Sequence, residues 1–189
     1  LGLLLLAREP SLTVTGLELS PAACALADRT AAANGLTDRL ITLPCDLRDR
    51  RQLPPAGRFD LAVSNPPYFP AGGGKTAAGS RGIHRAELAC TMEQLCAAAA
   101  YLLRSGGQFC LVYRTERLAE LMETLRRHRL EPKVLRFVQK NAASAPSLLL
   151  MACRKDGGTG LTVQPPLLLQ NDDGTETPEL RRIYFKEKG

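Results

Sequence analysis

Residues 59–68 read Phe-Asp-Leu-Ala-Val-Ser-Asn-Pro-Pro-Tyr. The first six are apolar almost throughout, which is typical of a strand that is buried on both faces of a parallel sheet. The strand has to end at residue 64, because the prolines that follow fix φ and cannot donate to a sheet ladder. The stretch therefore predicts a buried strand that ends in a rigid Asn-Pro-Pro-Tyr turn.

Strand and helix patterns alternate on both sides of this stretch. The alternation predicts an α/β fold of the Rossmann-like, doubly wound type with a mostly parallel sheet. Further strands are predicted at 12–17, 40–43, 108–113, 133–139, 147–153 and 165–169, and helices at 3–7, 21–33, 91–105 and 115–129, with a short one after Thr177-Pro178.

Capping residues mark the helix boundaries. Ser20 precedes a proline at the first helical position, and Asn34-Gly35 ends the same helix. Thr91 with Gln94 three residues later predicts a capping box for an alanine-rich helix. Thr115 is the expected cap of the next helix.

The composition excludes several classes of protein. The 189 residues contain 25 basic and 19 acidic side chains, a net charge of +6, with 44% hydrophobic residues. These values exclude a disordered chain, a collagen and a membrane bundle, and the apolar run 3–7 is too short to span a bilayer. We expect a cytoplasmic protein. Six cysteines without a C-x-x-C pair, and two histidines, favour neither structural zinc nor a disulfide scaffold.

Three polar residues lie at or just beyond the carboxyl ends of predicted strands: Glu18, Asp46 and Asn65. In doubly wound sheets, ligands bind beyond the carboxyl ends of the strands, so these residues are predicted to share one site. Each also has a simpler interpretation. Glu18 could be a first-turn helix charge, Asp46 a solvent-facing turn residue, and the Asn-Pro-Pro-Tyr segment a rigid turn.

The Asn-Pro-Pro-Tyr segment suits a particular ligand. Its prolines hold the neighbouring carbonyls outward, and one such carbonyl beside the Asn65 amide oxygen makes two acceptors for an –NH₂ group. Tyr68 adds a flat face on which a heteroaromatic ring can stack.

This segment resembles that of the amino-directed, S-adenosylmethionine-dependent methyltransferases, in which N/D-P-P-Y/F follows the fourth strand. The resemblance implies that Asn65 and the Pro66 carbonyl orient the target amine, with Pro67 and Tyr68 completing the catalytic turn. In-line attack on the sulfonium methyl then needs positioning more than a dedicated base.

The same resemblance implies which residues hold the cofactor S-adenosyl-L-methionine. Glu18 and Leu19 would lie at its ribose, where an acidic side chain binds the two hydroxyls. Asp46 and Leu47 would meet its adenine, and Asn65 would complete the cofactor-binding set.

Longer stretches narrow the resemblance. Residues 83–87, 130–138 and 165–184 are similar to the bacterial tRNA1(Val) (adenine-37-N6)-methyltransferase-like family. That similarity implies that the protein methylates the N6 amine of an adenine in tRNA. Its partner would then be tRNA, and neither a metal nor a membrane is expected. Amino-methylation of a protein glutamine, an rRNA guanine or a DNA adenine stays open, as does a non-catalytic RNA-binding module.

The Gly-rich segment 69–87 follows the turn and is predicted to be a substrate loop. Its Lys75, Arg81 and Arg85 could grip phosphates, although a solvated basic loop is the simpler alternative. Gly-Gly-Gly-Lys-Thr at 72–76 is not a phosphate-binding P-loop, because Phe69 stands where that motif requires glycine.

The resemblance also sets an expectation for domains. The family opens with a strand and a D-x-G-x-G-x-G loop, and neither precedes Leu1. We therefore expect a truncated or partly disordered version of a longer protein, with a sheet lacking its first strand. Residues 1–154 would form the N-terminally truncated methyltransferase domain, and residues 155–189 a C-terminal extension packed on it.

Overall fold

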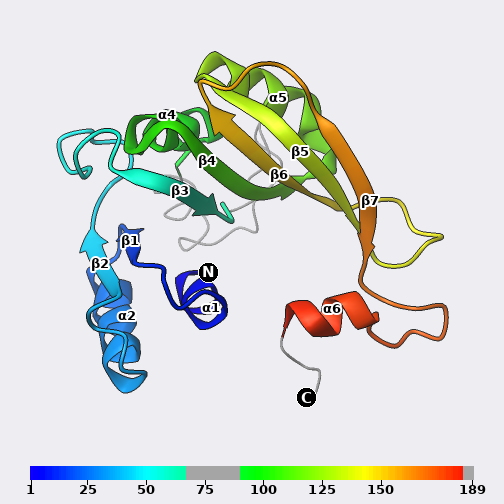
Figure 1. Ribbon diagram of the computed structural model, residues 1–189, viewed down its shortest axis with the longest axis horizontal. Helices are drawn as coiled ribbons and strands as arrows, with labels where there is room; N and C mark the ends of the chain where they lie inside the picture. The colour runs from blue at the N-terminus through cyan, green and yellow to red at the C-terminus, as the bar shows by residue number, and fades with distance from the viewer. Residues whose placement is uncertain (67–89, 185–189) are drawn as a thin grey trace, which may run out of the picture. The chain divides into compact units, whose positions relative to one another are not determined.

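The computed structural model describes residues 1–66 and 90–184, and the chain forms two compact units, Leu1–Pro55 and Ala56–Gly189 (Figure 1). Helices and strands alternate, which confirms the predicted α/β class. The described strands pair in two sheets, one of two strands and one of five. Three of the five pairings among them are parallel, so the sheet structure is mixed.

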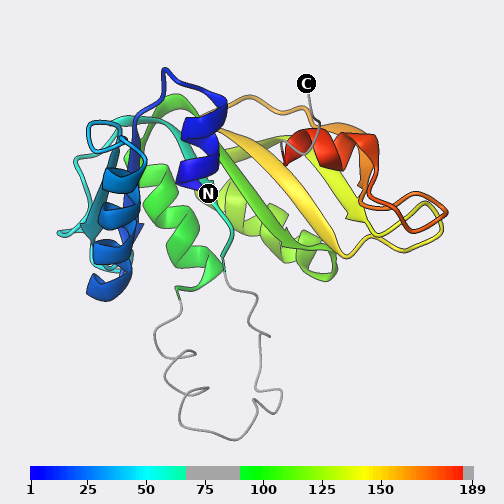
Figure 2. The ribbon, with the colours of Figure 1, turned by 90° about the horizontal axis from the view of Figure 1, so that it is seen from below.

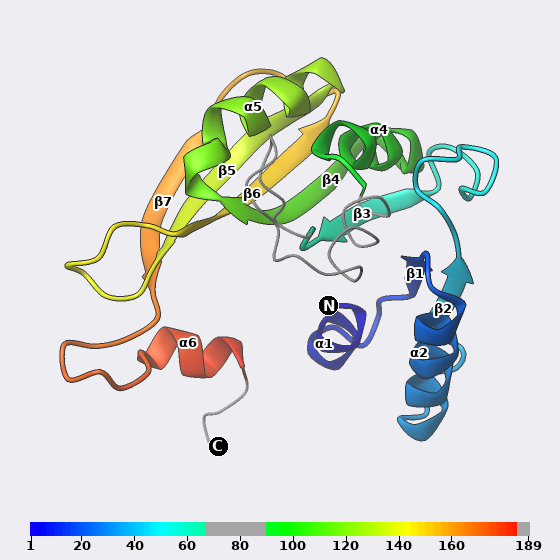
Figure 3. The same ribbon diagram turned by 180° about the vertical axis from the view of Figure 1, so that it is seen from behind.

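The first unit packs two helices on a parallel strand pair (Figure 3). Its small core joins Leu6, Ala31 and Leu40, one residue from each of three elements. Its elements are α1 (Gly2–Arg8), β1 (Val14–Glu18), α2 (Pro21–Ala33) and β2 (Leu40–Pro44).

Helix α2 begins and ends where the capping residues predicted. The Ser20 hydroxyl accepts a hydrogen bond from the Ala23 N–H, 3.4 Å away, and Pro21 occupies the first helical position. Gly35 follows the helix at φ +64°, a left-handed conformation that suits glycine because it has no Cβ. The boundaries of α2 therefore set the lengths of the two loops that connect it to β1 and β2.

Arg39 ties the beginning of the first unit together. Its Nε donates to the Leu12 carbonyl at 3.1 Å, and its Nη2 donates to the Glu9 carbonyl at 3.1 Å. The same Nη2 reaches the Leu6 carbonyl at 3.4 Å, at the end of α1. One side chain next to β2 thereby satisfies carbonyls that the end of a short helix leaves unpaired.

The second unit is built on the five-stranded sheet, in the order β3-β4-β6-β5-β7. Helices α4 and α5 cover one face of this sheet (Figures 1 and 2). Its elements are β3 (Phe59–Ser64), α4 (Met92–Leu102), β4 (Leu103–Arg114), the 3₁₀ turn η1 (Thr115–Arg117), α5 (Leu118–Arg127), β5 (Leu130–Gln139), β6 (Leu148–Lys155), β7 (Thr162–Leu168) and α6 (Pro178–Ile183).

The core of the second unit follows the two-residue period of its strands. Phe109 and Leu111 on β4 and Met151 on β6 are buried, and the side chains between them are more exposed. Leu121 and Leu125 of α5 are fully buried. The apolar face that α4 and α5 cover therefore arises from simple alternation along the sheet.

Three local predictions are wrong. Strand β3 is predicted to be buried, yet none of its residues is buried and Val63 is 37% exposed. The alanine-rich helix ends at Leu102, three residues before the predicted end, and β4 begins at once. Gly107 lies so close to its neighbours that a Cβ would stand 2.9 Å from the Arg104 carbonyl oxygen, which explains a glycine inside this strand. Thr115 caps no helix, because its hydroxyl donates to the Pro146 carbonyl at 2.8 Å.

The C-terminal part of the chain joins the same sheet. Strand β7 pairs in parallel with β5, and the Thr177 hydroxyl caps α6 by accepting from the Leu180 N–H at 3.2 Å. Arg136 on β5 grips Glu179 on α6 with two hydrogen bonds of 2.7 and 2.8 Å. The domain division at residue 154 stays a prediction.

In the part of the chain that the structure describes, every helix falls short of the length and apolarity that a bilayer crossing requires.

The capping box of α4 provides a test of the local structure. The Thr91 hydroxyl accepts from the Gln94 N–H at 3.2 Å, and the Thr91 N–H donates to Gln94 Oε1 at 2.9 Å. Thr91→Ala should lower the free energy of unfolding by about 1 kcal/mol, measured by urea denaturation. Thr91→Ser keeps the hydroxyl and should retain most of the stability. Equal losses in both variants would contradict the capping role.

Candidate functional site

Strands β1 and β2 bring two predicted site residues to one edge of the first unit. They pair in parallel with Glu18 opposite Pro44, and the Cys45 N–H donates to the Glu18 carbonyl at 2.8 Å. Asp46 follows immediately. The loops after both strands therefore leave the sheet side by side, each with an acidic residue at its start.

The Glu18 carboxylate is held at one oxygen and open at the other. Oε1 accepts from the Ser20 N–H at 2.9 Å, at the entrance to α2. No donor from the described residues reaches Oε2. The half-buried side chain thus keeps acceptor capacity for hydroxyl donors, and the neighbouring Leu19 is 40% exposed.

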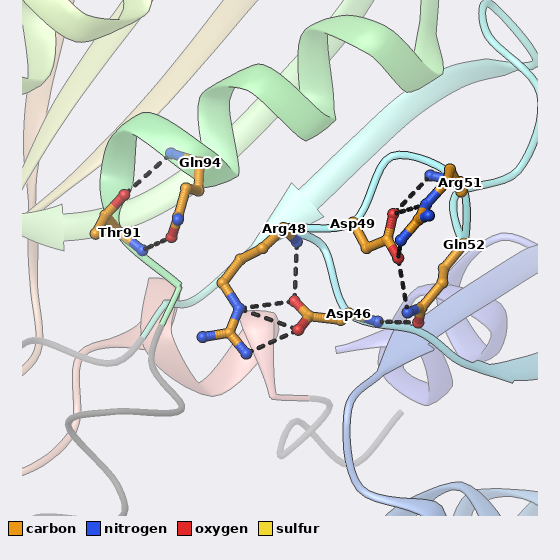
Figure 4. A network of polar contacts seen from close by, with 7 residues as sticks. All are labelled: Asp46, Arg48, Asp49, Arg51, Gln52, Thr91 and Gln94. Atoms are coloured by element: carbon orange, nitrogen blue, oxygen red, sulfur yellow. Dashed lines mark hydrogen bonds and ion pairs between the residues drawn. The ribbon is translucent and has the colours of Figure 1, made fainter.

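Asp46 is clasped by Arg48 (Figure 4). The Arg48 N–H and Nε each donate to Oδ1 at 2.9 Å, and Nη2 donates to Oδ2 at 2.7 Å. The Asp46 side chain is 24% exposed. Hydrogen bonds from Arg48 hold the pKa of the Asp46 carboxyl below its usual range, and the guanidinium charge adds to this effect.

Gln52 holds the backbone of the same loop (Figure 4). Its Oε1 accepts from the Asp46 N–H at 3.0 Å, and its Nε2 donates to Asp49 at 3.2 Å. The Cys45 thiol donates to the Gln52 carbonyl at 3.5 Å, and burial raises the pKa of that thiol. Residues 45–52 thereby form a closed polar network around Asp46.

The loop contains a second clasp of the same design. Arg51 donates to Asp49 from its backbone N–H at 3.1 Å and from Nε at 2.9 Å. Hydrogen bonds from Arg51 strongly lower the pKa of the Asp49 carboxyl. The Arg51 side chain is 89% exposed, whereas that of Arg48 is 33% exposed.

Asn65 and Pro66 lie in the second unit, directly after β3. Strand β3 pairs in parallel with β4, with Ser64 opposite Leu111. The exposed Asn65 therefore lies at the carboxyl edge of the five-stranded sheet, the edge at which β4 ends with Arg114. This placement matches the predicted position of the turn at a strand tip.

The structure brings together only part of the predicted site. Glu18 and Leu19 lie beside the loop of Asp46 and Leu47 in the first unit, and Asn65 and Pro66 belong to the second. The prediction that all three strand ends form one site stays a prediction. The following predicted residues, with the rest of the segment 69–87, lie outside the described residues: Pro67, Tyr68, Lys75, Arg81 and Arg85.

Sequence reasoning missed Arg48 and Gln52. The signal was present as an Asp-x-Arg spacing that occurs twice in succession, at 46–48 and 49–51, before the glutamine. Adjacent backbone and guanidinium donors can both reach a carboxylate two residues earlier, as Asx-type turns do.

The cysteines of the described chain are free thiols, and those described residues hold no group of side chains suited to a metal ion. Burial raises the pKa of Cys96 to about 12, so this thiol stays protonated at neutral pH. It packs as a small core residue.

Comparison with known proteins identifies the family. Residues 1–138 match the methyltransferase small domain. The chain belongs to this family. The enzyme class predicted from the sequence, an S-adenosyl-L-methionine-dependent methyltransferase with that cofactor, is thereby confirmed.

One relative and two solved structures illustrate the similarity. A tRNA1(Val) (adenine(37)-N6)-methyltransferase of Porphyromonas gingivalis W83 is 30% identical over 188 residues, covering 97% of this chain and 73% of the relative. A predicted O-methyltransferase of Agrobacterium tumefaciens, Atu636, shares the fold with a TM-score of 0.77 at 20% identity, over 96% and 81% of the two chains. Geranyl diphosphate C-methyltransferase of Streptomyces coelicolor, solved with S-adenosyl-L-homocysteine, gives 0.56 at 12% identity, over 81% and 66%.

The clasp on Asp46 predicts a titration. By carboxyl ¹³C NMR, Asp46 should titrate below the ordinary aspartate pKa of about 3.9. The sign follows from linkage: the pair stabilises the fold above the ordinary pKa, and this contribution is lost as pH falls through the lowered pKa. Arg48→Gln should move the titration back up, whereas Arg51→Gln should leave it nearly unchanged. An ordinary pKa in the wild type would contradict the clasp.

Proposed function

We propose that the protein methylates the exocyclic N6 amine of an adenine in tRNA, with S-adenosyl-L-methionine as the methyl donor. The observation that carries the proposal is the 30% identity to the Porphyromonas tRNA1(Val) (adenine(37)-N6)-methyltransferase, which extends over 97% of this chain. The Asn-Pro-Pro-Tyr segment at 65–68 supports an amine as the target atom.

The loops after β1 and β2 suit the adenosine part of the cofactor. A ribose offers two hydroxyl donors, and the open oxygen of the Glu18 carboxylate is an acceptor for them. An adenine offers an –NH₂ donor, which fits the partly exposed Asp46 carboxylate. Leu19 and Leu47 would supply the apolar contacts beside these two acceptors.

Bound S-adenosyl-L-methionine supplies an electrophilic methyl group on a sulfonium. The amine of an adenine is a poor nucleophile, because its lone pair is delocalised into the ring. Asn65 Oδ1 and the Pro66 carbonyl would each accept a hydrogen bond from one N–H of the amine. These two hydrogen bonds return electron density to the nitrogen and fix its direction of attack. Pro67 would keep the turn rigid, and Tyr68 would stack on the base.

The distribution of charge supports a nucleic-acid substrate for the second unit. Residues 1–55 contain six basic and six acidic side chains, so residues 56–189 carry the whole excess of six positive charges. The proposed substrate residues Lys75, Arg81 and Arg85 belong to this basic part. A polyanion would therefore be drawn to the part of the chain that contains the Asn-Pro-Pro-Tyr turn.

The cofactor role of Glu18 has a matched control. Glu18→Ala removes the carboxylate acceptor for the ribose, and it should weaken binding of S-adenosyl-L-homocysteine by roughly 10- to 100-fold in calorimetry. Glu9→Ala is the control, because Glu9 accepts from the Ser11 N–H at 3.1 Å in the same local pattern as Glu18 from Ser20. Equal affinities of the two variants would exclude the ribose contact.

The chemical role of Asn65 is tested by methyl transfer. The purified protein is incubated with radiolabelled S-adenosyl-L-methionine and unmodified tRNA, and the labelled nucleoside should be N6-methyladenosine. Asn65→Ala should lower kcat by roughly 10²- to 10³-fold, because the lost contact forms at the target amine. Asn171→Ala, which removes an amide from the turn before α6, should keep the activity.

Parallel reactions with a protein extract, ribosomes and unmethylated DNA distinguish the other amine substrates. Label in a protein glutamine, an rRNA guanine or a DNA adenine instead of tRNA would contradict the proposed tRNA substrate. The proposed methylation of an amine would still stand. RNA binding without label in any substrate would favour a non-catalytic module.

A further inference from the structure

The acceptor capacity of the Asp46 carboxylate is almost filled from within the loop. An ionised carboxylate has about four lone-pair positions, two on each oxygen. The Arg48 N–H and Nε take the two on Oδ1, and Nη2 takes one on Oδ2. The single Nε proton is shared with Oδ2, which lies 3.0 Å from Nε, and no other donor from the described residues reaches this carboxylate. Three N–H groups of Arg48 thus occupy the carboxylate, which leaves room for one further donor, on Oδ2.

We propose that Arg48 is a positioning residue that leaves Asp46 a single acceptor for the 6-amino group of the cofactor's adenine and so makes the site selective for a 6-amino purine. This inference rests on the proposed contact between Asp46 and adenine. Arg48 acts through Asp46, because its backbone N–H, its Nε and its Nη2 all donate to that carboxylate.

The hydrogen bonds from Arg48 fix the orientation of the Asp46 carboxylate and also favour its charged form. A guanidinium is a planar fork, and its paired donors hold both oxygens of a carboxylate in one plane. Gln52 holds the other side of the residue, because its Oε1 accepts from the Asp46 N–H at 3.0 Å. Backbone and side chain are thus both restrained before any ligand binds, which reduces the ordering that binding requires.

A restrained, ionised acceptor discriminates between purines. A 6-amino group donates a hydrogen bond to it, whereas a 6-oxo group presents a second acceptor and leaves the two oxygens facing each other. Sites built to hydrogen-bond one group reject analogues that cannot make the bond, since polar groups are then left unpaired. If Asp46 rotated freely, it could turn away from the carbonyl and lose this selectivity.

The ligand pair for the test is S-adenosyl-L-homocysteine and its 6-oxo analogue, S-inosyl-L-homocysteine, with Kd measured by calorimetry. The wild type should prefer the amino ligand by roughly 10-fold or more, as one hydrogen bond to a charged group requires. Arg48→Gln should reduce this preference several-fold, mainly by weakening the amino ligand. Arg48→Lys, which retains the charge without the fork, should lie between the two.

Arg51→Gln is the matched control, because Arg51 makes the same clasp on Asp49, farther along the loop. It should leave both affinities unchanged. A general loosening of the loop would instead weaken both ligands equally in the Arg48 and Arg51 variants, with the preference preserved, and would overturn the proposal.

Asp46→Ala separates the inference from the proposed function. If this variant loses the preference and Arg48→Gln keeps it, the positioning role is wrong and the adenine contact stands. If Asp46→Ala keeps the preference, the adenine contact itself is wrong, and the inference fails with it. Tighter binding of the amino ligand by Arg48→Gln would show that Arg48 competes for the carboxylate, which also overturns the proposal.

Discussion

The parallel pairing of β1 and β2 is the constraint on which the candidate cofactor site depends. With Glu18 opposite Pro44 and the Cys45 N–H on the Glu18 carbonyl, both strands stop at the same level. Their side chains alternate between faces, so a shift of one residue would move every apolar side chain of a strand to the other face. The core of Leu6, Ala31 and Leu40 therefore fixes the positions of the two acidic residues as well as stabilising the unit.

The two acidic residues are prepared in different ways. Glu18 takes one donor, the Ser20 N–H, which also belongs to the residue that caps α2. Asp46 takes its donors from Arg48, two residues away, so its loop is organised by contacts within eight residues. Local contacts of this kind close short loops at low entropic cost. The geometry at Asp46 thus depends little on distant parts of the chain.

The sequence predicted most where local chemistry decides the structure. The observed limits of β3 and α2 match the predicted ones, because two prolines end the strand and Ser20 and Gly35 bound the helix. It failed at Thr115, where a partner 31 residues away takes the hydroxyl, and at the start of β4, where pairing with β3 ends α4 early. The role of Arg48 was not predicted, because the sequence of a polar loop is the same whether its arginine is solvated or binds a neighbouring carboxylate.

On the proposed roles, the enzyme meets two adenine amines and treats them differently. Asp46 would accept one hydrogen bond from the cofactor's amine, since three N–H groups of Arg48 already donate to its carboxylate. Asn65 Oδ1 and the Pro66 carbonyl would offer the target amine two, one for each proton. A single hydrogen bond orients an amine, whereas acceptance of both protons also enriches its nitrogen in electron density. The count of acceptors in each place would then decide which adenine is only recognised and which is activated for methyl transfer.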